Sequence, residues 1–511
     1  MFGTTFTKAS RASASVAALL LGAAPLAADS NGTMLRDIDS AKLGEVNFAT
    51  SCSAEGQSAF DVGLLLLHHM MYRQADQAFQ AAAVADPDCA MAQWGIAMTK
   101  FHPLWPGGPT PNEAEAGQAA ADRLKNMTPG TEREAAYIDT VQTFYDGKDL
   151  NFRERLAAWA TRQRTLDEAY PDDLDAAAFD ALAQLTMAPR GPEAVPELRD
   201  AGQRMDALRA KAPRHPAGYH YAIHAYDHPA LAEQGLEVSR AYDGIAPNVP
   251  HALHMPSHVF TRLGLWTESA DWNARSAAAV LDQMHGDIIA DHYPHAIDYA
   301  VYAHLQAGEI AAAKALLADL ERHTNLENTF GSAYATAAAP ARLHLETGDW
   351  AAAAVLTTRM NPAIAWERYP QALSMRWFAK GLGAARSADL DAARAAISKI
   401  TALKVAMTER GMGYWVTLSD SQIGTITAWI AFAEGDSDRA VALLQEAADK
   451  EDAVGKAPVT PGHLLPAREL LGDLLMALGR HDSAAEAYMA ALAISPNRAR
   501  SLKGAAGKSS R

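Results

Sequence analysis

Histidines are concentrated in the middle of the chain. The sequence has 18 histidines, and 11 of them fall between His215 and His304. Imidazole nitrogens are common ligands for Zn, Cu, Ni and Fe, and the ring also carries protons near neutral pH. The concentration therefore predicts a metal site or a polar ligand-binding surface in this part of the molecule.

Two pairs of histidines repeat at one interval. His220 and His224 are four residues apart, and His254 and His258 repeat that spacing 34 residues later. Residues at i and i+4 lie on the same face of an α-helix. If each pair lies on the first helix of a helical hairpin, stacked hairpins place all four side chains on one inner face. Neighbouring helices pack about 10 Å apart, so we expect the four imidazoles to meet at one metal ion.

Other ligand types accompany these pairs. Asp227 follows the first pair, and a third unit that starts near Pro294 adds His295 and Asp298. A carboxylate can complete a metal shell or orient an imidazole ligand. The predicted ion is Zn, Cu, Ni or Fe. Its predicted ligands are His220, His224, His254, His258, His295, Asp227 and Asp298, with His251 and His102 as second-tier candidates.

Two other roles stay open for the same histidines. They would also suit a groove that binds an anionic, small-molecule or peptide ligand, or they would be structural residues bonded to loop carbonyls. Pro256 disfavours a helix interior, so the helix that carries His254 and His258 is expected to begin or kink there. His215, His228, His285, His292 and His304 are interpreted as surface or turn residues, and His68 and His69 as packing residues.

Helical repeats are the elements that must position these residues. Segments 56–89 and 465–498 have small residues and an aromatic ring at the tetratricopeptide (TPR) positions of close helix packing, and a proline that ends the second helix. We therefore predict an all-α, right-handed superhelical solenoid of about ten TPR-like helix-turn-helix units. The matching residues are Gly63, Ala75, Phe79, Ala82 and Pro87, then Leu471, Gly472, Ala484, Tyr488, Ala491 and Pro496.

The chain divides by composition into successive segments. Residues 1–28 have the pattern of a secretory signal, because Lys8 and Arg11 precede an apolar stretch that is too short to span a bilayer. The remaining predicted segments are a lead-in at 29–55, a first hairpin and following helix at 56–102, a Pro/Gly-rich loop at 103–114, irregular helical repeats at 115–215, histidine-rich repeats at 216–327, further repeats at 328–500 and a disordered tail at 501–511.

Cysteine usage and charge bear on the compartment and the partners. Cys52 precedes the first predicted helix and Cys89 ends the second, and these two points lie side by side in a helical hairpin. In an oxidising compartment such a pair predicts a disulfide, with two buried thiols as the alternative. The net charge of -15 argues against a nucleic-acid partner, and no later segment is suited to span a membrane. A periplasmic or secreted protein is expected.

Several motifs resemble those of a group of exported bacterial tetratricopeptide proteins. The specific part is YHYAIHAYDHP (219–229), PHALHMPSHVFTRLGLW (250–266) and HAIDYAVYAHLQAG (295–308), and the likeness extends to HPLW (102–105) and over nearly the whole chain. The resemblance implies a helical-repeat fold and includes the seven predicted metal ligands in its motifs. It implies no reaction, so enzyme, metal carrier and scaffold all stay open.

Overall fold

The computed structural model describes residues 39–105, 108–284, 286–358 and 360–507. Within these residues the chain is all-α, and its one extended pairing is an isolated bridge between Ile289 and Leu326. The prediction of an all-α helical solenoid is confirmed. The predicted signal segment and His285 lie outside the described residues. None of the described helices is long and apolar enough to cross a membrane.

The N-terminal part consists of antiparallel helices in sequential contact. Helix α5 starts at Pro111, earlier than the predicted end of the Pro/Gly-rich loop, because Thr110 and Glu113 form a capping box around it. The elements are η1 (Ser40–Lys42), α2 (Ala54–His68), α3 (Tyr72–Ala85), α4 (Ala90–Met98), α5 (Pro111–Leu124), α6 (Glu132–Asp146), α7 (Phe152–Ala169), α8 (Leu174–Met187), η2 (Gly191–Ala194) and α9 (Val195–Lys211).

The central part carries the predicted site on short helices. Pro256 has no amide hydrogen to donate to the carbonyl of Ala252, and the helix is interrupted at Met255. The elements are α10 (Ala217–Tyr226), η3 (Ala232–Gly235), α11 (Leu236–Ala241), η4 (Tyr242–Gly244), α12 (Pro250–His254), α13 (Pro256–Leu263), α14 (Trp266–Asp282), α15 (His292–Gln306) and α16 (Ile310–Arg322).

The C-terminal part ends in a helix where the sequence predicts disorder from Ser501 on. Buried Ser501 donates a hydrogen bond to Glu469, and buried Arg498 also pairs with Glu469, so α25 is fixed to the repeat before it. Residues 508–511 lie outside the described residues. The elements are α17 (Phe330–Thr347), α18 (Trp350–Ala354), η5 (Trp366–Arg368), α19 (Pro370–Arg386), α20 (Leu390–Glu409), α21 (Gly413–Ala433), α22 (Ser437–Val454), α23 (Ala467–Ala477), α24 (His481–Ile494) and α25 (Ala499–Ala506).

Close helix packing at the predicted TPR positions is visible at two glycines. A Cβ added at Gly63 would lie 2.7 Å from the ring of Phe79, and one at Gly472 would lie 2.7 Å from the ring of Tyr488. Only glycine allows these helices to approach that closely. The first hairpin is also closed by a disulfide between Cys52 and Cys89, whose Cα atoms are 4.8 Å apart. The predicted bridge is therefore present in the structure.

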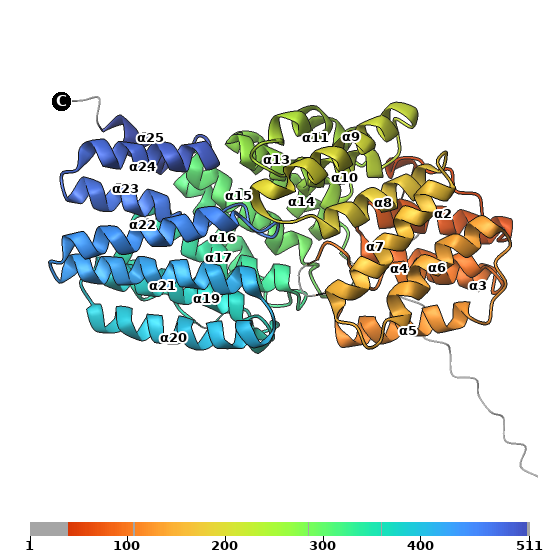
Figure 1. Cartoon of the computed structure of the whole chain (residues 1–511), viewed down its shortest axis with the longest axis horizontal. Coiled ribbons are helices and arrows are strands. Elements are labelled where there is room, and N and C mark those ends of the chain that lie inside the picture. Colours follow the sequence, from red (N-terminus) through yellow and green to blue (C-terminus); the bar gives the residue numbers. More distant parts are fainter. Residues whose placement is uncertain (1–38, 106–107, 285, 359, 508–511) are drawn as a thin grey trace, which may run out of the picture.

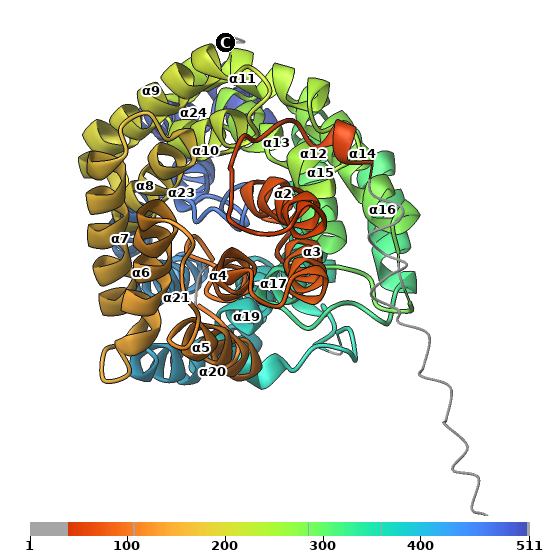
Figure 2. The ribbon, with the colours of Figure 1, turned by 90° about the vertical axis from the view of Figure 1, so that its right-hand side faces the viewer.

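The winding of the repeats brings distant segments onto the central helices. Figure 1 shows α2–α8 at one end, α19–α25 at the other, and the central helices between them. Figure 2 shows α2 and α3 inside a curve of helices that runs from α6 through α10 to α16. From the other side, residues 455–466, between α22 and α23, return to α15, where the Tyr299 hydroxyl contacts the carbonyl oxygens of Pro458 and Thr460 at 3.0 and 3.1 Å.

Candidate metal centre

The central helices bring the predicted histidines into two adjoining groups. The first triad is His254, His258 and His295, from α12, α13 and α15, and the second triad is His220, His224 and His251, from α10 and α12. In each triad, one ring nitrogen per residue lies within 4.8 Å of the others. The four histidines of the predicted shared site, His220, His224, His254 and His258, are thus divided between the two triads.

The reason for this division is an offset between neighbouring inner helices. The ring of His220 lies 4.9 Å from that of His251, and the ring of His254 lies 4.3 Å from that of His295. By repeat position, His220 matches His254, and His254 matches Asp298. The observed partners, His251 and His295, each come three residues earlier in the chain, which is about one helical turn. His251, predicted as second-tier, is thus brought into a triad, and its ring lies 5.0 Å from that of His292.

A chain of hydrogen bonds fixes two rings of the first triad, those of His254 and His258. His258 Nδ1 lies 2.9 Å from Asp227 Oδ2, and His254 Nδ1 lies 2.7 Å from Asn273 Oδ1. Asn273 Nδ2 donates to the Ser269 carbonyl at 2.7 Å, so its amide oxygen faces His254. Between the two imidazoles, the Nε2 atoms lie 3.0 Å apart.

These contacts determine where the ring protons lie. The Asp227 carboxylate and the Asn273 amide oxygen only accept hydrogen bonds, so Nδ1 of each histidine carries the hydrogen. Each neutral ring then has a lone pair on Nε2. The two lone pairs face one another at 3.0 Å with no hydrogen between them. The chain of hydrogen bonds begins at a carboxylate and ends at a carbonyl, so the contact between the two Nε2 atoms lacks a hydrogen. Either a proton or a metal ion would remove the repulsion at this contact.

Burial disfavours protonation of the histidines, and neighbouring cations favour ionisation of Asp227. Burial lowers the pKa of His254 well below its usual value, and it lowers that of His258 against the opposing effect of Asp227. Burial alone would raise the pKa of Asp227, but Lys456 and Arg262 hold it well below its usual range. Lys456 Nζ is 3.0 Å from Asp227 Oδ2, and Arg262 Nε is 2.8 Å from Oδ1.

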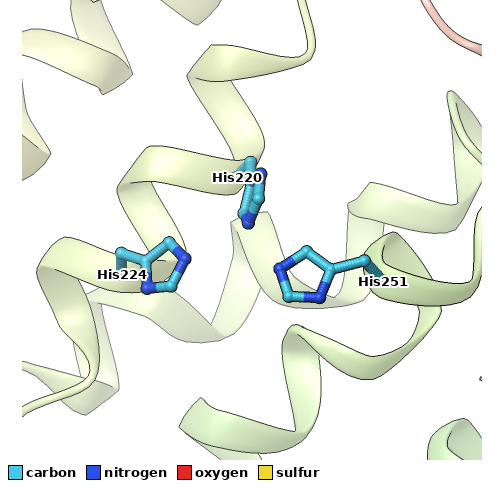
Figure 3. A group of neighbouring side chains, drawn as sticks. All are labelled: His220, His224 and His251. Carbon is cyan, nitrogen blue, oxygen red and sulfur yellow. The ribbon is translucent and has the colours of Figure 1, made fainter. Parts of the chain in front are cut away.

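The second triad has free ring nitrogens. Figure 3 shows the rings of His220, His224 and His251 turned toward a common centre. His220 Nδ1 donates to the His68 carbonyl at 2.6 Å. Nε2 of His220, Nε2 of His224 and both nitrogens of His251 are buried and have no hydrogen-bond partner. Burial lowers the pKa of all three rings, that of His224 to about 3.

Two predicted ligands lie away from both triads. Asp298 is fully buried, but its oxygens lie 2.8 and 3.4 Å from Nε and Nη2 of Arg342, which also bonds the His463 carbonyl. The guanidinium contacts both carboxylate oxygens and links Asp298 to residues 455–466, and Asp298 belongs to neither triad. His102, predicted as second-tier, has Nε2 3.0 Å from Glu113 Oε1, outside both triads.

Other residues of the site were not predicted from the sequence. His292 was interpreted as a surface or turn residue, yet it lies beside His251. A usable signal was present, because His251 and His292 each stand three residues before a predicted ligand. Lys456 is 229 residues from Asp227 in the chain, and no local pattern marks it.

A third buried group has a different hydrogen-bond pattern. His68, Asp175 and His215 also have ligand atoms within 4.8 Å of one another. His68 Nε2 and His215 Nε2 lie 2.9 and 3.2 Å from Asp175 Oδ1. His68 Nδ1 lies 3.0 Å from the Tyr221 hydroxyl, and His215 Nδ1 accepts from the Ala217 amide at 3.3 Å. Every ring nitrogen in this group has a partner.

Comparisons with known proteins give distant structural likenesses. No protein-family model and no curated protein matches the chain. Among solved structures, an APC/C Cut9–Hcn1 hetero-tetramer matches with 10% identity over 90% of each chain and a TM-score of 0.31. The TPR domain of P58(IPK) matches with 15% identity over 89% of this chain and 98% of that one, with a TM-score of 0.21. A Naa15/Naa10 complex bound to HypK-THB has a TM-score of 0.24, with 14% identity over 88% of this chain and 60% of that one. These values are low, and none of the matches bears on the site.

Proposed function

We propose that this helical-repeat protein binds a transition-metal ion through His254, His258 and His295. The observation that carries the proposal is the pair of Nε2 lone pairs 3.0 Å apart, each fixed by a hydrogen bond on the opposite side of its ring. A bound cation converts this repulsive contact into a shared ligand pair. The lowered pKa values of both rings disfavour a proton in that place at neutral pH.

The dimensions suit an ion of the predicted kinds. Imidazole nitrogens bind Zn at about 2.0–2.1 Å, which separates two ligands of a tetrahedral ion by about 3.3–3.4 Å. The observed 3.0 Å between the two Nε2 atoms needs only a small adjustment of the rings. The hydrogen bond from His258 to Asp227 is the carboxylate–histidine contact that orients a metal ligand and raises its basicity. Zn, Cu, Ni and Fe all suit imidazole donors.

Three protein ligands favour a working ion over a purely structural one. Structural zinc is usually held by four protein ligands, whereas three leave a position for water or substrate. The triad would therefore serve a metalloenzyme or a carrier that exchanges its ion. The rival role as a peptide-binding groove is less well supported, because His254 and His258 are only 1% and 3% exposed. Tyr299, which contacts residues 455–466, packs on their rings at 4.7 and 5.1 Å.

We also propose that the protein works outside the cytoplasm. The disulfide between Cys52 and Cys89 supports an oxidising compartment, and residues 1–28 have the composition of a secretory signal. Fractionation of expressing cells, with mass spectrometry of the mature N-terminus, tests this. Protein retained in the cytoplasm with residues 1–28 intact would contradict export.

Metal titration of matched variants tests the site. Purified protein is stripped with a chelator and titrated with Zn, Cu and Ni by competition with a metal indicator. His258→Ala should weaken binding by more than the roughly 10–100-fold typical of a residue that only orients a ligand. His481→Ala is the control, because His481 is exposed on α24, away from both triads. Equal affinity in the two variants would contradict the proposal, and a peptide captured independently of metal would favour the scaffold.

A further inference from the structure

Four unpartnered nitrogens mark the second triad as an incomplete site. They belong to His220, His224 and His251, and two of these side chains are 0% and 2% exposed. Buried polar atoms in folded proteins nearly always have a hydrogen-bond partner, and an exception indicates a bound water, ion or ligand. Each of the three imidazoles can turn a lone pair toward one point, which offers a shared cation three nitrogen ligands.

We infer that His220, His224 and His251 hold a second metal ion, so that the inner face of the solenoid carries a two-metal centre. This inference rests on the proposed function of the first triad, because it assumes that the same face selects the same kind of ion. The ring nitrogens lie within 4.8 Å of one another. Metal–nitrogen bonds of about 2.0–2.1 Å bring such ligands to about 3.3–3.4 Å apart, and side-chain rotation supplies that contraction.

The His68 carbonyl positions one ligand of this second site. It accepts the hydrogen of His220 Nδ1 at 2.6 Å, which leaves the lone pair on Nε2, toward His224 and His251. His68 ends α2, in the hairpin that the disulfide closes. The N-terminal hairpin thus fixes the tautomer of a ligand more than 150 residues away in sequence, as the contacts around a metal-binding histidine ordinarily do.

The two sites are close enough to act together. The rings of His224 and His258 are 6.3 Å apart, and those of His251 and His254 are 6.2 Å apart. The ring of His292, next to that of His251, extends this series of imidazole rings. A small pocket lined by His292, Pro250, Met71 and exposed Arg73 lies at this end of the series of rings.

The charge balance identifies the class of ligand that the centre would take. All six triad residues are imidazoles, which bring no negative charge to the site, and the nearby Asp227 is already paired with Arg262 and Lys456. Two divalent ions would therefore leave a buried excess of positive charge, which is unfavourable unless an anion enters. We expect a small anion, such as hydroxide or an anionic substrate, at the open positions between the ions.

Stoichiometry distinguishes this inference from the proposed function. The full-length protein is equilibrated with Co(II) or Zn(II), dialysed and analysed for metal per chain. We expect two ions in the wild type, one in His224→Ala and one in His258→Ala. Azide should change the visible spectrum of the Co(II) form. His224 is partly exposed, so its variant is expected to fold, and circular dichroism checks that it does.

Four other outcomes each have a definite meaning. One ion in the wild type that is lost in His258→Ala and kept in His224→Ala would overturn the second site and leave the proposed function intact. No retained ion in the wild type would overturn both. One ion lost in both variants would mean a single site that spans the triads, which also overturns the inference. A two-ion wild type whose spectrum ignores azide would overturn the anion-binding part.

Discussion

Two kinds of buried histidine group lie side by side in this molecule. In the group of His68, Asp175 and His215, both nitrogens of each imidazole have a partner, and the carboxylate accepts from both rings. In the second triad, four ring nitrogens have none. Both groups have ligand atoms within 4.8 Å of one another. Proximity and burial are thus shared, and the ring nitrogens without a partner are what distinguish the proposed metal site from a structural hydrogen-bond network.

The largest expected effect concerns the acid stability of the metal-free protein. The six triad histidines have lowered pKa values when folded and an ordinary value near 6.5 when unfolded. The unfolded chain therefore binds more protons as the pH falls through about 6.5, and the free energy of unfolding falls by up to about 1.4 kcal/mol per histidine between pH 7.5 and 5.5. Urea unfolding midpoints between pH 7.5 and 5.5 check this. A flat profile would show that the rings are already protonated or otherwise satisfied.

Breaking the satisfied group should destabilise the fold without emptying the metal site. Asp175→Ala leaves two buried imidazole donors without their acceptor and should lower the free energy of unfolding by about 3–5 kcal/mol. Metal affinity of the first triad should change by no more than about twofold, because the sites share no residue. Thermal unfolding and metal titration of the same preparation measure both quantities. A large loss of affinity in a variant that folds would mean that this group belongs to the metal site.

Asp227 should matter through the ring that it orients. In Asp227→Asn, the amide can present its NH2 group to His258, which moves the ring proton to Nε2 and removes the lone pair. We expect metal binding to weaken by about 10–100-fold. Asp243→Asn is a matched control, since Asp243 forms a partly exposed ion pair with Arg275. Similar affinities in the two variants would contradict the orienting role of Asp227.

The smallest effect is expected from Lys456, and it has the opposite sign. Lys456 shares Asp227 Oδ2 with His258 and adds a positive charge beside the site. Lys456→Met should strengthen metal binding by about 3–10-fold. The substitution removes about 1 kcal/mol of repulsion between the ammonium group and the metal ion, which neighbouring charges partly screen. Competition titration measures it. Weaker binding would mean that Lys456 is needed to hold Asp227 in place.

The repeat fold could be predicted from the sequence because its signals are local. Gly63 and Phe79 lie 16 residues apart and meet in one hairpin, so their spacing alone predicts their contact. The offset between stacked hairpins has no comparable signal in the spacing of residues along the sequence. The 34-residue interval paired His220 with His254, whereas the stacked helices pair His220 with His251.

Long-range contacts account for the other differences. Asp298 stands at the repeat position predicted for a ligand, but its carboxylate pairs with Arg342 from the next repeat. Lys456 and Arg498 reach their partners from the C-terminal repeats. The contacts of Arg498 and of buried Ser501 fix a tail whose composition alone predicts disorder. Such partners are determined by the winding of the whole solenoid, which the sequence of one repeat does not specify.

Anomalous diffraction from crystals of the metal-loaded protein tests the central claim most directly. Data collected on both sides of the absorption edge of the bound metal locate the ion independently of affinity measurements. We predict a peak about 2.0–2.2 Å from ring nitrogens of His254, His258 and His295, between the two Nε2 atoms that now face each other at 3.0 Å. A peak confined to His68, Asp175 and His215, or to surface histidines such as His481, would contradict the account.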